Sequence, residues 1–282
     1  MGKKRILYVS QEISPYTKEN KRSNFCMNLP QVVQENDNDI RIFMPKFGTI
    51  NERRHQLHEV IRLSGMNLII DDFDHQLIIK VASVQQSRMQ VYFIDNEEYF
   101  PKRHYLNDPE GNFMQNNDER MMFFCKGVIE TVKKLGWAPD IIHCNGWFSA
   151  LVPMYIKKLY NKDPMFANTK IYYTVFDNPF KGDLNNSLSE KLLFEDLQDK
   201  DVEMIGNPTF DNLNKFAISY SDAVVQGSKK LSKNLLNFIK NNKIPVLVKI
   251  DDDNFEEQCL SFYDSTEKTK KTKKNKQLVE VV

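Results

Sequence analysis

Short apolar runs alternate with helix-like stretches along most of the chain, and this alternation most constrains the fold. An apolar run of about four to eight residues between polar loops is typical of a strand buried in a parallel sheet. Apolar residues recurring every three or four positions indicate the buried face of a helix. The expected strands are 6–10, 40–44, 140–144, 170–175, 223–225 and 244–250, and the expected helices include 117–136, 147–159, 210–220 and 228–239. This order predicts an α/β fold, with a Rossmann-like, doubly wound, mostly parallel sheet and helices on both faces.

Residues 57–95 depart from the alternation. Several β-like runs follow one another there, without a helical stretch between them. This pattern predicts an antiparallel excursion from the main sheet.

The domain organisation follows from the same patterns. We expect residues 1–250 to form one domain and residues 251–282 to form a polar, flexible tail. The tail contains a cluster of lysines at 268, 270, 271, 273, 274 and 276.

Charge and cysteine content exclude several classes of function. The formal net charge is only +1, so nucleic acid is not an expected partner. No run approaches the roughly 20 apolar residues of a membrane span, so we expect no membrane partner. The four cysteines, at 26, 125, 144 and 259, match no metal or redox spacing. We therefore expect free thiols in the cytoplasm, with no metal and no other cofactor.

Glycine limits the kind of nucleotide site that the chain can form. The sequence has 10 glycines in 282 residues, about half the usual share of roughly 7%. They are scattered, so no Gly-rich phosphate loop of the G-x-G-x-x-G or P-loop type is present. Any nucleotide must therefore be held by other groups.

Polar residues follow three of the expected parallel strands. The segments are 10–22, 143–147 and 175–179. Ligands of open α/β sheets bind beyond the carboxyl ends of the strands. We therefore expect these segments to meet at one site.

Several motifs in these and neighbouring segments occur together in one order. Ser10-Gln-Glu-Ile-Ser-Pro15 is followed by Lys18, and Leu135 to His143 reads L-G-W-A-P-D-I-I-H. Between them lie Arg41 to Ile50, Asp95 to Phe100, and Asn116 to Phe124. Over about residues 3 to 240, the chain resembles the N-terminal domain of bacterial glycogen synthase and plant starch synthase. That resemblance implies one half of a GT-B fold and retaining transfer of glucose from ADP-glucose to the end of an α-1,4-glucan.

The chain departs from the family pattern at several functional positions. The family's Lys-Thr-Gly-Gly loop is here Lys18-Glu-Asn-Lys21, which keeps the lysine, loses both glycines and places Glu19 beside the expected diphosphate site. Asn145 stands where the family has an active-site histidine, and Phe176 replaces another histidine. Trp147 is kept, and Asp177 replaces an asparagine. The catalytic residues are therefore unknown.

The candidate substrate-binding residues are each open to two interpretations. Lys18 either binds phosphate or is one cation of a solvated loop, and Asn145 either binds a sugar hydroxyl or caps the helix that begins near Trp147. Trp147 either stacks on a sugar or lies in the core. Tyr99, with Phe100 and Tyr105, either forms a glucan platform or packs a lid. Asp177 is carried over from the family motif alone, and His143 is expected to be a core histidine.

Two functions remain open at this stage. The family's second domain carries most donor-binding residues, and the residues after 250 are too few and too polar to form it. One hypothesis is a glucosyltransferase half, weak or inactive alone, whose cleft a second protein chain completes. The other is a non-catalytic regulator of glycogen metabolism that binds α-glucan or protein.

Overall fold

The fold is built around one large, mostly parallel sheet. A computed structural model describes residues 3–84, 87, 89–182, 184–249 and 254–266. The strand order within these residues is β10-β9-β8-β7-β1-β2-β6-β5-β3, with β4 paired to β5. The parallel strands are β1 (Arg5–Ser10), β2 (Asp39–Pro45), β6 (Gln90–Asp95), β7 (Ile141–Asn145), β8 (Lys170–Val175), β9 (Ala223–Gln226) and β10 (Val246–Val248). The predicted fold class is confirmed.

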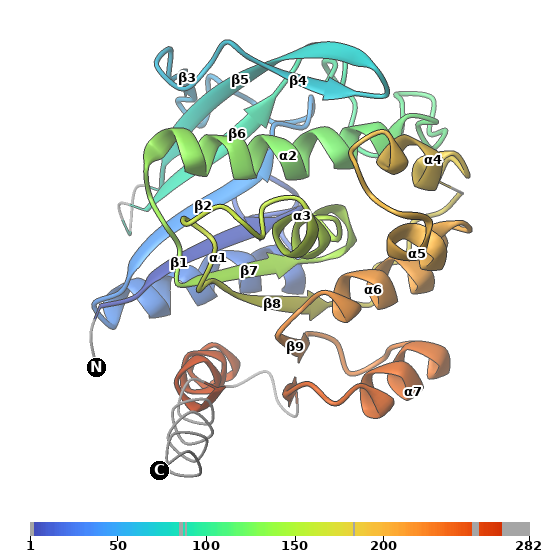
Figure 1. Cartoon of the computed structure of the whole chain (residues 1–282). Helices are drawn as coiled ribbons and strands as arrows, with labels where there is room; N and C mark the ends of the chain where they lie inside the picture. The colour runs from blue at the N-terminus through green and yellow to red at the C-terminus, as the bar shows by residue number, and fades with distance from the viewer. Residues whose placement is uncertain (1–2, 85–86, 88, 183, 250–253, 267–282) are drawn as a thin grey trace.

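The antiparallel excursion is present but shorter than the expected 57–95, because its last run, β6, pairs in parallel with β2 and belongs to the main sheet. It comprises β3 (His58–Glu59), β4 (Met66–Ile70) and β5 (Phe73–Ser83), and it joins the main sheet where β5 pairs with β6. These strands form the upper part of the molecule in Figure 1. The excursion extends the sheet away from the site described below.

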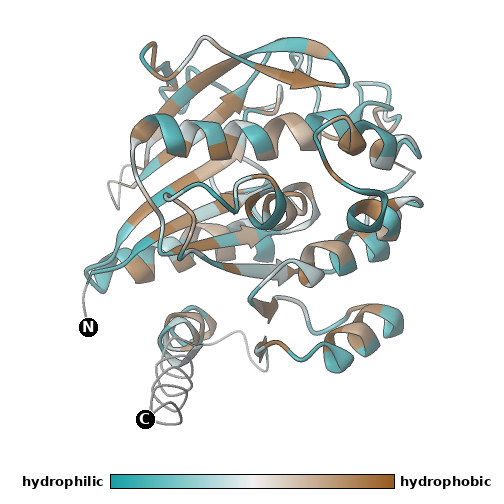
Figure 2. Cartoon of the chain, viewed as in Figure 1, coloured by the Kyte–Doolittle hydropathy of each residue, from teal (hydrophilic) through white to brown (hydrophobic). Residues whose placement is uncertain are grey.

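Helices cover both faces of the sheet. Figure 1 shows α2 and α3 in front of the strands and α1 behind them. The strands are mainly hydrophobic, whereas α2 alternates between hydrophobic and hydrophilic turns (Figure 2). The helices are α1 (Lys21–Glu35), α2 (Asn117–Leu135), α3 (Val152–Lys158), α4 (Leu188–Leu193), α5 (Asp199–Val202), α6 (Phe210–Ser219) and α7 (Lys233–Asn241), with 3₁₀ turns η1 (Trp147–Ser149) and η2 (Glu203–Ile205).

Local sequence explains where the main helices begin and end. α2 ends at Gly136, whose left-handed φ of 62° is easily adopted by glycine. α1 contains Pro30 in its interior, where the proline has no backbone N–H to donate to the preceding turn. The single helix expected at 147–159 is instead the turn η1 followed by α3. Pro153 lies at the start of α3, where its missing N–H leaves no hydrogen bond unmade.

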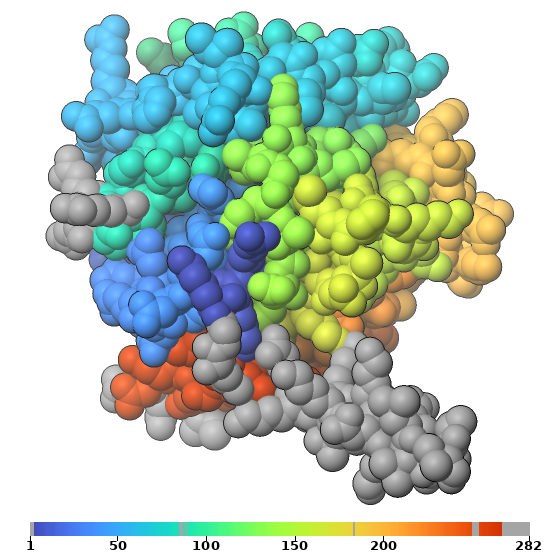
Figure 3. Space-filling view, turned by 60° about the vertical axis from the view of Figure 1, so that its left-hand side comes forward, coloured from blue at the N-terminus to red at the C-terminus, as the bar shows by residue number. Residues whose placement is uncertain are grey.

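A helical segment over residues 255–266 packs on the same face as α1. Phe255, Cys259 and Tyr263 are buried at spacings of four residues, and the ring of Phe255 lies 5.3 Å from that of Phe25 in α1. Figure 3 shows this segment against the N-terminal part of the chain, where Lys4 pairs with Asp264 at 2.6 Å.

The prediction of a flexible polar tail therefore does not hold for residues 255–266. The lysine cluster from 268 onward lies outside the described residues, and the domain boundary at 250 stays a prediction.

Candidate substrate cleft at the carboxyl ends of the strands

A cleft of about 570 Å³ opens where β1 and β7 end. From β1 the sheet grows through β2 and β6 toward one edge, and from β7 it grows through β8, β9 and β10 toward the other. The gap between the ends of β1 and β7 is therefore the topological switch point of the sheet. The loop after β1, Trp147 after β7, and residues 178–180 after β8 line the cleft, together with Tyr105 and Leu106. The three segments expected to meet therefore do meet.

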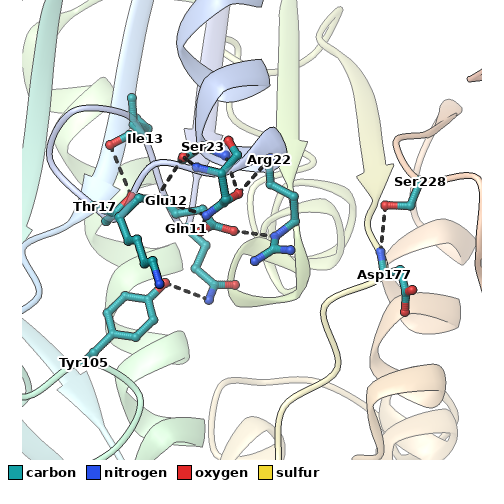
Figure 4. A network of polar contacts seen from close by, with 11 residues as sticks. Gln11, Glu12, Ile13, Thr17, Arg22, Ser23, Tyr105, Asp177 and Ser228 are labelled. Atoms are coloured by element: carbon teal, nitrogen blue, oxygen red, sulfur yellow. Dashed lines mark hydrogen bonds and ion pairs between the residues drawn. The ribbon is translucent and has the colours of Figure 1, made fainter. Parts of the chain in front are cut away.

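The loop after β1 supplies two cationic side chains. Lys18 is exposed at the cleft, and its ammonium has no partner among the described residues. The Nε of Arg22 donates to Oε1 of Glu12 at 2.6 Å, while Oε2 of Glu12 accepts from Asn20 at 2.9 Å. Figure 4 shows Glu12 and Arg22 facing each other. Glu12 offsets the positive charge of Arg22, and the charge of Lys18 then makes this wall of the cleft cationic.

The start of α1 shows how the chain replaces the two missing glycines. The side chain of Asn20 accepts from the backbone N–H groups of Arg22 and Ser23, at 2.8 and 3.0 Å. Ser23 accepts in turn from the backbone of Asn20 at 2.9 Å, which completes a capping box. These N–H groups are thereby occupied within the protein. An anionic ligand at this loop would therefore be bound by cationic side chains rather than by these backbone N–H groups.

Glu19 is exposed between Lys18 and Asn20, which both line the cleft. Its carboxylate accepts from Asn24 at 3.2 Å, and Glu19 itself does not line the cleft. A negative charge beside the diphosphate site stays a prediction. The carboxylate that does line the cleft belongs to Glu12, which the sequence analysis did not select.

Asn145 lies buried at the end of β7, only 2% exposed. Its amide donates to the hydroxyl of Ser10 at 3.2 Å, and its Oδ1 has no partner among the described residues. The helix-cap interpretation is wrong, because η1 begins after Gly146 without a side-chain cap.

His143, two residues earlier on β7, is a core residue as expected. Its Nδ1 shares a hydrogen bond with the hydroxyl of Tyr263, and its Nε2 with that of Thr174. Complete burial lowers the pKa of the imidazole to about 3, so the ring is neutral at physiological pH.

Aromatic rings form the opposite wall. The ring centre of Trp147 lies 4.7 Å from that of Phe180, and Phe180 stacks on Phe113 at 5.5 Å. Trp147 is buried yet lines the cleft, so its two interpretations are not exclusive. Tyr105 is half-buried at the rim, and its hydroxyl accepts from Gln11 at 3.4 Å.

Two predicted site residues lie outside the cleft. Asp177 is exposed, and only its backbone N–H is engaged, donating to Ser228 at 3.0 Å (Figure 4). Tyr99 is buried, with its hydroxyl bonded to His75 at 3.0 Å and Glu119 at 3.3 Å. Asn178, which follows Asp177, and Tyr105, in the loop after Tyr99, line the cleft instead.

Phe176 fills the space at the end of β8. Its ring packs edge-on against Phe25, with centres 5.8 Å apart. A Cβ at Gly227 would lie 2.5 Å from the Phe176 ring. The absence of a side chain at Gly227 therefore creates the room that the ring occupies. The family's imidazole position is thus replaced by a tightly packed apolar group.

Two other kinds of feature are missing from the described part of the chain. No group of three or more His, Cys, Asp or Glu side chains is arranged to hold a metal ion there. None of the described helices is long and apolar enough to cross a bilayer.

Comparisons with known proteins agree with the sequence motifs. The family profile of the starch synthase catalytic domain matches residues 5–248. The glycogen synthase of Chlorobium luteolum is 38% identical over 194 residues, covering 68% of this chain and 40% of that protein. The glycogen synthase of Chlorobaculum tepidum is 34% identical over 234 residues, covering 83% of this chain and 47% of that protein. The chain thus spans less than half the length of these relatives.

A solved structure shows the same fold. The catalytic domain of starch synthase IV from Arabidopsis thaliana, bound to ADP and acarbose, superposes with a TM-score of 0.69. The match covers 88% of this chain and 52% of the plant chain, at 19% identity. It supports the predicted half of a GT-B fold.

Proposed function

The chain belongs to the starch synthase catalytic domain family, and from this premise we propose that its cleft binds ADP-glucose and an α-1,4-glucan. The observation that carries the proposal is the position of Lys18. Its unpaired ammonium faces a cleft with aromatic walls at the switch point of the sheet. A phosphate needs a cation, and a sugar ring needs a concave, partly apolar surface with a few polar groups.

In this proposal the loop after β1 receives the diphosphate. During glucosyl transfer, the bond between C1 of glucose and the diphosphate oxygen breaks, and a glucan hydroxyl forms the new bond to C1. The diphosphate leaves with the bonding electron pair, and the hydroxyl loses its proton. Positive charge from Lys18 and Arg22 stabilises the negative charge that develops on the leaving group.

We propose that turnover by the isolated chain is weak. Asn145 has no titratable group, and Phe176 brings neither a charge nor a hydrogen bond to the end of β8. The neutral His143 cannot compensate, because both of its nitrogens are bonded within the core. The predicted second chain and the cytoplasmic location remain proposals. The location is supported by the burial of all four unpaired cysteines.

A second candidate function is a non-catalytic α-glucan-binding regulator. The packing of Phe176 against Gly227 favours it, because a close-packed apolar ring stands where the family has an imidazole. This candidate shares the cleft with the first and differs only in turnover.

Calorimetric titration with ADP and ADP-glucose tests the binding proposal. A charge-assisted hydrogen bond contributes about 1.5–3 kcal/mol, so Lys18→Ala is expected to weaken binding roughly tenfold to a hundredfold. Lys162→Ala, at an exposed lysine outside the cleft, is the matched control and should bind as the unmodified chain does. Binding that survives Lys18→Ala would contradict the assigned site.

Incorporation of labelled glucose from ADP-glucose into glycogen, measured with and without added cell extract, separates the two candidate functions: only a glucosyltransferase half should gain activity when the extract is added. The isolated chain should show little or no incorporation while still binding glycogen. Adding cell extract tests the second-chain proposal. Rapid elongation by the purified chain alone would refute both the weak-turnover proposal and the regulator.

A further inference from the structure

Three carboxamide oxygens at the carboxyl edge of the sheet lack hydrogen-bond partners. They are Oε1 of Gln11, Oδ1 of Asn145 and Oδ1 of Asn178, and each is buried without a partner among the described residues. Asn145 is the last residue of β7, and Gln11 and Asn178 follow β1 and β8, so all three lie at the carboxyl ends of neighbouring strands. Buried amide oxygens are normally hydrogen-bonded, so three exceptions at one edge require an explanation.

Gln11 and Asn178 both line the cleft. Gln11 is only 4% exposed, and its other amide atom is engaged because Nε2 donates to Tyr105. Its Oε1 lies near the end of β7, 3.7 Å from where a Cβ on Gly146 would stand. The free oxygen of Gln11 therefore lies between the ends of β1 and β7, on a residue that lines the cleft.

The chemistry of these oxygens selects the part of a ligand that can contact them. An amide oxygen only accepts hydrogen bonds, so it needs O–H or N–H donors. An ionised phosphate has no donor and would leave both oxygens unpaired. A hexopyranosyl ring carries several hydroxyl groups on a compact, partly apolar frame. It also matches the half-buried rings of Tyr105 and Phe180 in the same cleft.

We propose that Gln11 and Asn178 form a hydroxyl-binding subsite for a hexopyranosyl ring, next to the phosphate-binding Lys18 and Arg22. This inference rests on the proposed function and assigns its sugar recognition to two residues. The ring comes either from the end of the glucan or from the glucose of ADP-glucose. In both cases its hydroxyl groups donate to the two amide oxygens.

Near-isosteric apolar variants test the subsite. Gln11→Met and Asn178→Leu remove the oxygens while keeping the approximate volume. Gln31→Met makes the same chemical change on α1, outside the cleft, where Gln31 bonds to Glu35 at 2.9 Å. Each variant is titrated calorimetrically with ADP, ADP-glucose and maltoheptaose, and its thermal unfolding midpoint is measured without ligand.

The expected result is weaker sugar binding without loss of stability. We expect both cleft variants to bind ADP within twofold of the unmodified chain. Their affinity for maltoheptaose should fall roughly tenfold if the ring belongs to the glucan. If the ring belongs to the donor, the preference for ADP-glucose over ADP should fall by a similar factor. Removing an unpaired buried acceptor should not by itself lower the unfolding midpoint. Gln11→Met also removes the long 3.4 Å hydrogen bond to Tyr105, so Asn178→Leu gives the clearer test of stability.

Four other results would overturn the inference. Unchanged sugar affinities in both variants would show that the oxygens do not contact a ring. Lower unfolding midpoints with unchanged sugar affinities would show that the amides are structural. An unmodified chain that binds ADP but no sugar would remove the subsite and leave the nucleotide site intact. A chain that binds none of the three ligands would instead refute the proposed function itself, and the subsite with it.

Discussion

Gly227→Ala tests whether the Phe176 ring is packed too tightly at the end of β8 to move aside. The added Cβ would lie 2.5 and 2.7 Å from two atoms of the Phe176 ring and 2.7 Å from Cγ2 of Thr174. Optimal carbon–carbon contacts are about 3.5–4.0 Å, so the neighbours must move by about 1 Å.

The neighbours of Gly227 have little room to move. Phe176 is buried and packs on Phe25, and Thr174 is buried with its hydroxyl bonded to His143. Inserting a methyl group into a well-packed core typically costs about 1–3 kcal/mol. Because three contacts are violated at once, we expect Gly227→Ala to lower the free energy of unfolding by about 2–3 kcal/mol.

Denaturant unfolding followed by tryptophan fluorescence measures this change. The double variant Gly227→Ala/Phe176→Val provides the control, because valine lacks the ring atoms that the new Cβ would meet. The penalty for Gly227→Ala should shrink by about 1–2 kcal/mol in that background. A Gly227→Ala variant within about 0.5 kcal/mol of the unmodified chain, the usual range for neutral surface changes, would show that the Phe176 ring can move aside.

Three further predictions concern the core and the start of α1. The pKa of His143 is lowered from 6.5 to about 3 in the folded state, so the unfolded chain binds this proton first as the pH falls below about 6.5. The free energy of unfolding should therefore fall by about 2 kcal/mol between pH 7.5 and pH 5.0. In His143→Gln this contribution to the pH dependence should be absent when unfolding is measured at the same two pH values. Tyr263→Phe leaves the buried Nδ1 of His143 without a partner and should destabilise by about 1–3 kcal/mol. Tyr8→Phe should lower the free energy of unfolding by less, because the Tyr8 hydroxyl lies 3.4 Å from that of Tyr263, a long hydrogen bond. Equal effects of the two variants in urea unfolding would contradict these hydrogen bonds. Asn20→Ala removes the cap of α1 and should lower the free energy of unfolding by about 1 kcal/mol. An unchanged melting temperature, measured by circular dichroism, would argue against the capping box.

The main sheet could be predicted because its strands are marked locally. Most of the parallel strands are short, mainly apolar runs, and the long helix α2 has a broad apolar stripe that ends at Gly136. The segment over residues 255–266 has a weaker mark: Phe255, Cys259 and Tyr263 are buried at helical spacing, but the surrounding residues are mostly polar. Its partners include His143, 120 residues earlier. The spacing alone does not show that the segment packs against a strand so distant in sequence.

The location of the site was also predictable, but the choice of side chains was not. Parallel strands end at one edge of the sheet, so the three polar segments had to converge. Which residue of a loop faces the cleft depends on backbone geometry that composition does not reveal. Asp177 therefore points to solvent while Asn178 lines the cleft, and Tyr99 is buried elsewhere while Tyr105 lies at the rim. Glu12 was missed because its role depends on pairing with Arg22.

Amide hydrogen exchange in the presence of saturating ADP-glucose tests whether this cleft receives the sugar nucleotide. If it does, exchange should slow in residues 16–22, 105–106 and 178–180, which come from separate segments and line the cleft together. A second cavity of about 410 Å³ lies nearby, lined by residues 54–56 and 83–84 among others. Protection confined to that second cavity, with no change at 105–106 or 178–180, would show that the sugar nucleotide binds elsewhere.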